Sequence, residues 1–231
     1  MRIFLTGDTH GDFRRIACFC DQVETSKDDV LIILGDVGIN YFGDDRDIKN
    51  KEFLSSLPIT LFCIHGNHER RPYTVEGYQL EKRYGGHIYV QKEYPYILFA
   101  KDGEIYNFLD INCIVIGGAY SIDKNYRLKM GYHWFIDEQP SFEIKEYVEE
   151  QLEKKDWSID IVLSHTCPRK YEPIEVFLSN INQNLVDKTT EDWLDSIENR
   201  LNYLGWYCGH FHTSKKIDRI RFMFEDFIEL S

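Results

Sequence analysis

The chain has 231 residues, a length that suits one compact α/β domain, here expected over residues 1–231. It contains 27 Lys and Arg against 39 Asp and Glu, so its formal net charge is −12. An acidic chain is not built for bulk attraction to phosphate backbones, so we expect no bulk binding of nucleic acid, whereas a small phosphorylated substrate is compatible with this charge. No apolar run approaches a membrane span and no Cys-x-x-Cys pair occurs, so we expect a cytoplasmic protein without a membrane partner.

Three apolar runs near the start of the chain each lead into a glycine followed by polar side chains. The runs are Ile3–Thr6, Val30–Leu34 and Thr60–Cys63. Apolar runs of this length, without polar alternation, are typical of strands buried on both faces. Helices are expected between them, from Phe13 to Gln22 and from Asp47 to Ser56. The alternation of strands and helices predicts a parallel sheet with right-handed crossovers.

The middle of the chain changes to short strands at close spacing. These strands are expected at His87–Val90, Tyr96–Ala100, Ile105–Phe108 and Ile111–Gly118. With Asp102-Gly103 as a hairpin turn, they predict an antiparallel meander that forms a second sheet packed on the first. The segment from Ala119 to Gln139 is aromatic and charged with weak periodicity, and a long excursion of this kind is usually found over a site.

The last third of the chain alternates again between helix and strand. Helices are expected from Ser141 to about Lys155 and from Thr190 to Leu201. The expected strands are Asp160–Ser164, Trp206–Cys208 and the closing segment between Ile217 and Leu230, and Pro168 to Gln183 is expected to be loop with a short helix.

Side chains that bind metal ions follow these strands at the points where they end. They are Asp8, His10, Asp36, Asn67, His165, His210 and His212. Sites in α/β folds collect at the carboxyl ends of strands, so we expect these side chains to lie together. Carboxylate, amide and imidazole ligands without a thiolate favour Mn²⁺, Fe²⁺ or Zn²⁺. Seven ligands are too many for one ion and predict two ions that share a carboxylate.

Each of these residues also has a structural interpretation when it is taken singly. A lone His at a strand end more often satisfies a hydrogen bond, and Asp36 after Gly35 could belong to a turn or cap a helix. We interpret His65, His87 and His133 in this structural way. For the other residues the joint pattern favours the two-metal site.

Five sequence blocks resemble those of the calcineurin-like metallophosphoesterases. The blocks are Gly7-Asp8-Thr9-His10-Gly11, Gly35-Asp36, Gly66-Asn67-His68-Glu69, His165 and Gly209-His210-Phe211-His212. They occur in the family's order and span nearly the whole chain. The resemblance implies an α/β fold of four layers, an α-β-β-α sandwich with two mixed sheets.

The resemblance also implies a distribution of ligands and a mechanism. Asp8, His10, Asp36 and His212 would hold one ion, and Asp36, Asn67, His165 and His210 the other, with Asp36 shared. The cofactors would be two divalent ions, Mn²⁺ or Fe with Zn²⁺ as an alternative, and a hydroxide bridging them would attack phosphorus. His68 would be the catalytic residue that contacts the phosphate and protonates the leaving oxygen, a role that suits an imidazole.

The second block departs from that of the protein Ser/Thr phosphatases, which reads Gly-Asp-x-Val-Asp-Arg-Gly. Here Gly35-Asp36 continues Val37-Gly38-Ile39-Asn40, without the acid that steadies the catalytic histidine and without the phosphate-binding Arg. Other side chains must then bind the substrate. The candidates are Arg70, Arg71, Tyr120, Arg127 and Arg169.

The missing Arg also bears on the substrate. A monoester brings two negative charges, which a fixed guanidinium stabilises, so its absence from this block favours a phosphodiester. We expect a small-molecule or nucleotide phosphodiester as substrate. A phosphomonoesterase, including a Ser/Thr protein phosphatase, is the first alternative, and an inactive binding scaffold is the second.

Overall fold

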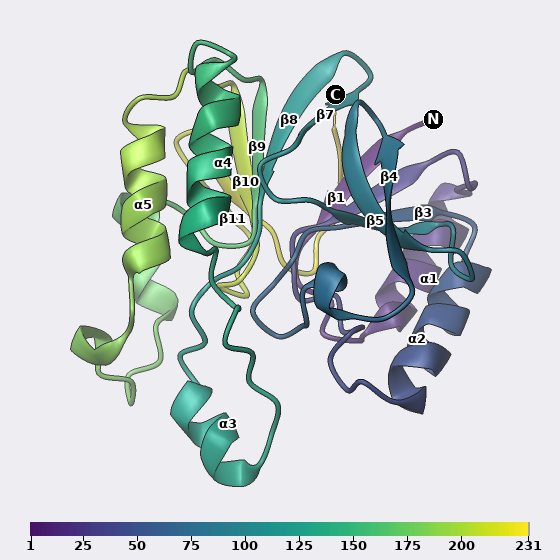
Figure 1. Cartoon of the computed structure of the whole chain (residues 1–231), viewed down its shortest axis with the longest axis horizontal. Helices are drawn as coiled ribbons and strands as arrows, with labels where there is room; N and C mark the ends of the chain where they lie inside the picture. Colours follow the sequence, from purple (N-terminus) through teal and green to yellow (C-terminus); the bar gives the residue numbers. More distant parts are fainter. Residues whose placement is uncertain (231) are drawn as a thin grey trace.

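Two β-sheets pack face to face between two layers of helices in the computed structural model, which describes residues 1–230 (Figure 1). The outer face of the first sheet carries α1 (Phe13–Val23) and α2 (Asp45–Ser56). The outer face of the second sheet carries α4 (Phe142–Glu153) and α5 (Thr189–Glu198). The expected four-layer α-β-β-α sandwich is confirmed, and the expected domain end at Ser231 lies one residue outside the described part.

The first sheet has seven strands in the order β13-β1-β2-β3-β6-β5-β4. Four neighbours run parallel, namely β1 (Ile3–Thr6), β2 (Val30–Ile33), β3 (Thr60–Cys63) and β6 (Ile97–Ala100). The others are antiparallel to their partners, namely β4 (Tyr78–Arg83), β5 (Gly86–Gln91) and β13 (Ile228–Glu229). Every residue of β1, β2 and β3 is buried, as their continuous apolar runs predict.

The second sheet has six strands in the order β11-β12-β10-β9-β8-β7. Its parallel part consists of β8 (Ile111–Ile116), β9 (Ile161–Ser164), β10 (Gly205–Cys208) and β12 (Ile220–Phe222). Its antiparallel edges are β7 (Ile105–Phe108) and β11 (Lys215–Ile217). Both sheets are therefore mixed, and each has a parallel centre whose strands end at one edge.

The expected four-strand meander is wrong in its assignment of strands to sheets. β5 and β6 belong to the first sheet, where β6 pairs in parallel with β3, and the chain crosses to the second sheet between β6 and β7. Asp102-Gly103 therefore connects two sheets and is not a hairpin turn. The Oδ1 of Asp102 accepts the Gly117 N–H at 2.7 Å, which fixes this crossover against the end of β8.

Three apolar layers hold the sandwich together. The layer between the sheets includes Phe62, Val115 and Leu163, and the outer layers pack the helices on the sheets. Helix α1 buries Phe13 and Ile16 at the spacing that predicted it. Each such buried side chain contributes about 1.5–3 kcal/mol to stability relative to an exposed one, so these layers stabilise the strands whose ends carry the loops.

The segment from Ala119 to Gln139 contains one helix that the sequence did not predict, α3 (Lys124–Met130). It projects away from the sandwich (Figure 1), and none of its residues is buried, which explains the missing apolar periodicity. Between α4 and α5 the expected loop contains three short 3₁₀ turns, η2 (Arg169–Tyr171), η3 (Ile174–Val176) and η4 (Gln183–Leu185). A further turn, η1 (Pro72–Thr74), follows β3.

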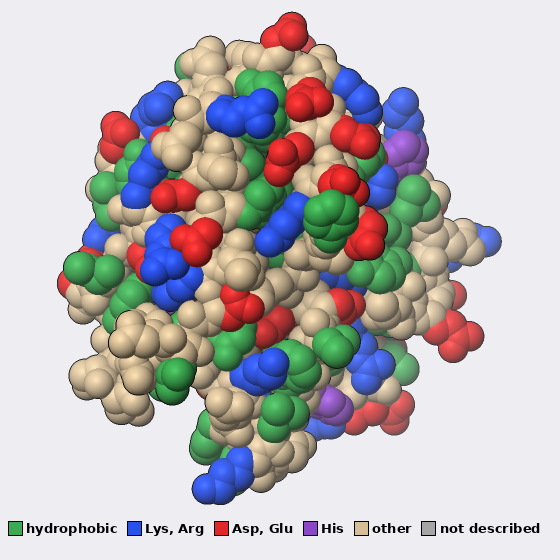
Figure 2. All heavy atoms as spheres, turned by 60° about the vertical axis from the view of Figure 1, so that its left-hand side comes forward, with side chains coloured by type: hydrophobic (Ala, Val, Ile, Leu, Met, Phe, Trp, Pro, Cys, Tyr) green, Lys and Arg blue, Asp and Glu red, His purple; other side chains and the backbone are tan. Residues whose placement is uncertain are grey.

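The surface reflects the charge of the chain. On the face shown in Figure 2, Lys and Arg side chains are interspersed with Asp and Glu, and no continuous basic area forms. Within residues 1–230, no helix combines the length and the apolar character needed to cross a membrane.

Candidate metal centre

The loops at one edge of the two sheets bring the seven predicted ligands together. Those after β1, β2 and β3 supply Asp8, His10, Asp36 and Asn67, and those after β9 and β10 supply His165, His210 and His212. The parallel order of the strands places these loops side by side. The two sheets also meet here, since His165 Nδ1 lies 2.8 Å from the carbonyl oxygen of Leu34.

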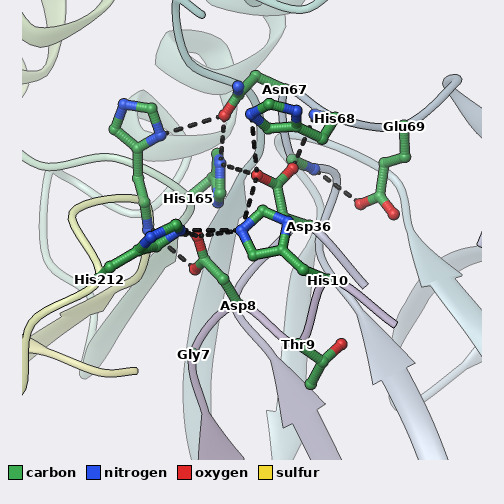
Figure 3. Close-up of polar contacts among 12 residues, drawn as sticks. Gly7, Asp8, Thr9, His10, Asp36, Asn67, His68, Glu69, His165 and His212 are labelled. Carbon is green, nitrogen blue, oxygen red and sulfur yellow. Dashed lines mark hydrogen bonds and ion pairs between the residues drawn. The ribbon is translucent and has the colours of Figure 1, made fainter. Parts of the chain in front are cut away.

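One group of donor atoms comes from Asp8, His10 and His212, and Figure 3 shows them facing one another. The Nε2 atoms of His10 and His212 are 2.8 Å apart. Asp8 Oδ2 lies 3.4 Å from Nε2 of His212 and 3.8 Å from Nε2 of His10. A carboxylate and two imidazoles that share so small a volume match the ligands that borderline divalent cations prefer.

A second group forms around Asn67 (Figure 3). Its Oδ1 lies 2.8 Å from His165 Nε2 and 3.1 Å from His210 Nδ1. Asp36 Oδ2 lies between the groups, 3.6 Å from His165 Nε2 and 3.8 Å from His10 Nε2. The donor atoms present therefore fit the binding of divalent cations, and the Asp36 carboxylate is within reach of imidazoles from both groups.

The backbone of this centre is strained and closely packed. His10, Asp36, His210 and His212 have positive φ angles of 46°, 49°, 66° and 48°, a region that costs non-glycine residues about 1–3 kcal/mol each. A Cβ at Gly66 would lie 2.0 Å from Asp36 Oδ1, and one at Gly209 would lie 2.1 Å from Asp8 Oδ1. Glycine is thus required beside these ligands because the carboxylates occupy the space of a side chain.

The electrostatics favour the ligand forms of these groups. Burial by itself raises the pKa of Asp36, but the imidazoles of His165 and His68 bring it below its ordinary value. Burial also raises the pKa of Asp8, but the hydrogen bond with His212 outweighs burial and brings this pKa below its ordinary value. Burial, together with His165, lowers the pKa of His210 to about 3, which keeps this imidazole neutral. Ionised carboxylates and neutral imidazoles are the forms that bind cations. His212 differs, since its hydrogen bond with Asp8 raises its pKa.

Glu69 is a structural part of the centre for which the sequence predicted no role. Its fully buried carboxylate accepts the backbone N–H of Gly66 at 2.9 Å and that of Val37 at 3.2 Å. Burial and the nearby Asp36 raise the pKa of Glu69. The side chain of Glu69 thus connects the loops after β2 and β3. In the sequence, the position of Glu69 directly after His68 in the motif was the one indication of such a role.

Ser121 is a second residue that the sequence did not single out. Its hydroxyl oxygen accepts a hydrogen bond of 2.8 Å from Nδ2 of Asn67. The two residues are 54 positions apart, so no local pattern could have indicated this contact.

His68 stands beside the two groups without joining either. Its backbone N–H donates to Asp36 Oδ1 at 2.8 Å, and its ring Nε2 lies 3.9 Å from Asp36 Oδ2. Burial lowers the pKa of His68, and Asp36 opposes this effect. The ring lines a cavity of about 380 Å³ with His10, Arg127 and three residues that the sequence had not indicated, Tyr41, Phe42 and Asn50.

Of the five candidate substrate-binding residues, Arg127 is the one that lines this cavity. Arg71 is 2% exposed, forms an ion pair with Asp102 and donates from Nε to the Asp137 carbonyl oxygen at 2.8 Å. Arg169 is exposed and pairs with Asp192 at 3.0 Å. Tyr120 and Arg70 are partly exposed and are not among the residues lining the cavity.

Comparisons with known proteins bear on the family and the fold. A family model described as calcineurin-like phosphoesterase matches residues 1–214. The solved structure of TT1561 from Thermus thermophilus superposes with a TM-score of 0.53 at 13% identity, covering 96% of this chain and 88% of that one. A second solved structure gives a TM-score of 0.50 at 12% identity, with coverages of 96% and 89%. At these identities the likeness shows the fold alone. No curated protein matches the sequence.

Proposed function

This chain belongs to the calcineurin-like phosphoesterase family of metal-dependent phosphoesterases, and from this we propose that it hydrolyses a phosphodiester of a small molecule or nucleotide with two bound divalent ions. One observation carries the proposal: the Asp36 carboxylate lies within 4 Å of imidazoles from both ligand groups. Asp8, His10 and His212 would complete one site, and Asn67, His165 and His210 the other.

The donor atoms favour Mn²⁺ or Fe, with Zn²⁺ as an alternative, because they combine oxygen with imidazole nitrogen and include no thiolate. The chemistry that such ions supply is a more acidic water and positive charge against phosphoryl oxygens. The chain's own contribution is to hold seven donors on strained, closely packed loops, so little reorganisation is needed when ions bind.

His68 is proposed as the residue that gives a proton to the leaving oxygen. Its backbone is held by Asp36 while its ring faces the cavity, so the imidazole can reach substrate without binding a cation. Burial lowers the pKa of His68 in the free protein, whereas a phosphate ester beside the ring would raise it through its negative charge. Substrate binding therefore favours the protonated form that the role requires.

Arg127 is proposed to bind a phosphoryl oxygen of the substrate. Nε donates to Asp123 Oδ2 at 2.8 Å, and Nη1 donates to the Tyr41 hydroxyl at 3.2 Å and to the His133 carbonyl at 3.1 Å. These contacts fix the guanidinium at the cavity and leave Nη2 without a hydrogen bond among the described residues. A preorganised guanidinium loses little freedom when it binds an anion.

Arg127→Ala is expected to raise KM about 10–100-fold with a smaller change in kcat, because a hydrogen bond to a charged group contributes about 1.5–3 kcal/mol. Steady-state kinetics on the preferred substrate measure the effect. Arg169→Ala is the matched control, since this exposed Arg pairs with Asp192 outside the cavity. An unchanged KM in Arg127→Ala would remove this residue from the site.

The nucleotide part of the proposal rests on the surroundings of Arg127. A second hollow of about 520 Å³ shares Tyr41, Phe42 and Arg127 with the cavity and is also lined by Tyr126 and Tyr132. Both of these tyrosines are more than half exposed, so their rings are available for stacking. Stacking of a base on an aromatic side chain contributes about 1–3 kcal/mol. A phosphate ester with a planar base suits this arrangement.

An activity screen with Mn²⁺ tests the proposal. It compares an aryl phosphodiester and cyclic nucleotides with an aryl phosphomonoester and a phosphopeptide. We expect faster turnover of diesters, because the cavity offers one guanidinium and a monoester brings a second negative charge. Much faster turnover of the phosphopeptide would identify a protein phosphatase instead. Absence of both turnover and metal binding would leave the scaffold alternative.

A further inference from the structure

The side-chain amide of Asn67 is held in one orientation by a residue far away in the sequence. Its Oδ1 faces the imidazoles of His165 and His210, and its Nδ2 donates to the Ser121 hydroxyl at 2.8 Å. Rotating the amide by half a turn would break this hydrogen bond and point the NH₂ group at the imidazoles. Such a rotation would remove the oxygen from the place where a cation needs it.

Ser121 is in turn fixed by Glu138. The Ser121 N–H donates to Glu138 Oε1 at 3.2 Å, and the indole Nε1 of Trp134 donates to Oε2 at 2.7 Å. Ser121 and Glu138 are each 2% exposed, so solvent does not compete for these contacts. A buried carboxylate with two donors is a rigid support for the Ser121 backbone, and so for the position of the Ser121 hydroxyl.

Glu138 also closes the base of the excursion between Ala119 and Gln139. Its carbonyl oxygen accepts the Ala119 N–H at 3.2 Å, so the two ends of the excursion meet at this residue. The excursion carries α3 and Arg127, and Lys124 of α3 lies over the Trp134 ring at 3.9 Å. A continuous series of contacts thus runs from α3 through Trp134, Glu138 and Ser121 to Asn67.

We propose that Ser121 and Glu138 are positioning residues for the ion bound through Asn67, and that they couple this ion to the closure of the excursion. The proposal rests on the metal centre of the proposed function. Coupling between two sites is reciprocal, so an ion that needs an oriented Asn67 also stabilises the closed excursion. The excursion would then present Arg127 to substrate most firmly when the metal is bound.

Titration calorimetry with Mn²⁺ on the full chain tests the first part. Wild type is expected to bind two ions, and Ser121→Ala to bind one of them about 10–100-fold more weakly, the usual cost of losing a residue that orients a ligand. Ser121→Thr keeps the hydroxyl and should restore affinity. Thr60→Val is the matched control, because it removes a buried hydroxyl bonded to the Lys27 carbonyl at 2.7 Å, on the strand that leads to Asn67.

Hydrogen exchange of residues 122–136 tests the coupling. Mn²⁺ should slow this exchange in wild type and have a smaller effect in Ser121→Ala. Glu138→Gln provides a second variant of equal size should Ser121→Ala fail to fold, and it should weaken the same ion. Wild-type affinity in both folded variants, with two ions bound in wild type, would overturn the inference and leave the proposed function intact. A wild type that binds no Mn²⁺ would overturn the metal centre, and this inference with it.

Discussion

Asp36→Asn is expected to remove bound metal and phosphoesterase activity together. The carboxylate lies 3.6 Å from His165 Nε2 and 3.8 Å from His10 Nε2, so it is within reach of both ligand groups. An amide of the same shape keeps an oxygen for the His68 N–H but loses the negative charge. A loss of several kcal/mol of charge stabilisation corresponds to a rate lower by about 10³ or more.

Elemental analysis after reconstitution with Mn²⁺, together with the rate on the preferred diester, measures the two effects. The melting temperature of the metal-free protein serves as the check on folding. Asp192→Asn is the control for loss of a carboxylate, since Asp192 is exposed and pairs with Arg169. A folded Asp36→Asn protein that retains two ions and the wild-type rate would contradict the shared-ligand assignment.

His68→Ala is expected to lower kcat by about 10²–10⁴ on substrates with poor leaving groups, while both ions stay bound. The ring lines the cavity and is assigned to neither ion, so its removal takes away a proton donor and leaves the seven ligands intact. Nitrophenolate leaves without a proton, so an aryl ester should lose much less activity. An alkyl ester or a nucleoside leaving group should show the full loss.

The comparison of kcat on activated and unactivated esters decides the role of His68. The metal content and the melting temperature of the His68→Ala protein are measured in the same experiment. If His68 were a structural residue of its turn, the melting temperature would fall and all substrates would suffer alike. Equal losses on both kinds of ester, with metal retained, would count against the proton-donor role.

The seven candidate ligands could be named from the sequence because their positions follow from local patterns. Continuous apolar runs such as Val30–Leu34 define strands, and the polar residues after them must lie where those strands end. Parallel strands bring these ends to one edge of each sheet, so proximity within a sheet follows from the sequence. The packing of the two sheets then brings His165, His210 and His212 against the ligands of the first sheet. The helices α1, α4 and α5 were predictable for a similar reason, because each buries an apolar face on a sheet.

Other features were decided by the tertiary structure alone. Apolar strands such as β6 and β7 look alike in sequence, and pairing with β3 or β8 assigns each to its sheet. By their charge alone, Arg71 and Arg127 are equally good candidates for binding phosphate. In the structure Arg71 forms an ion pair with Asp102 in the interior, whereas Arg127, on the excursion, lines the cavity. The contact between Ser121 and Asn67 joins two segments with no shared periodicity. Local sequence determines which side chains a strand or loop presents, whereas the partners that they meet depend on how distant segments pack.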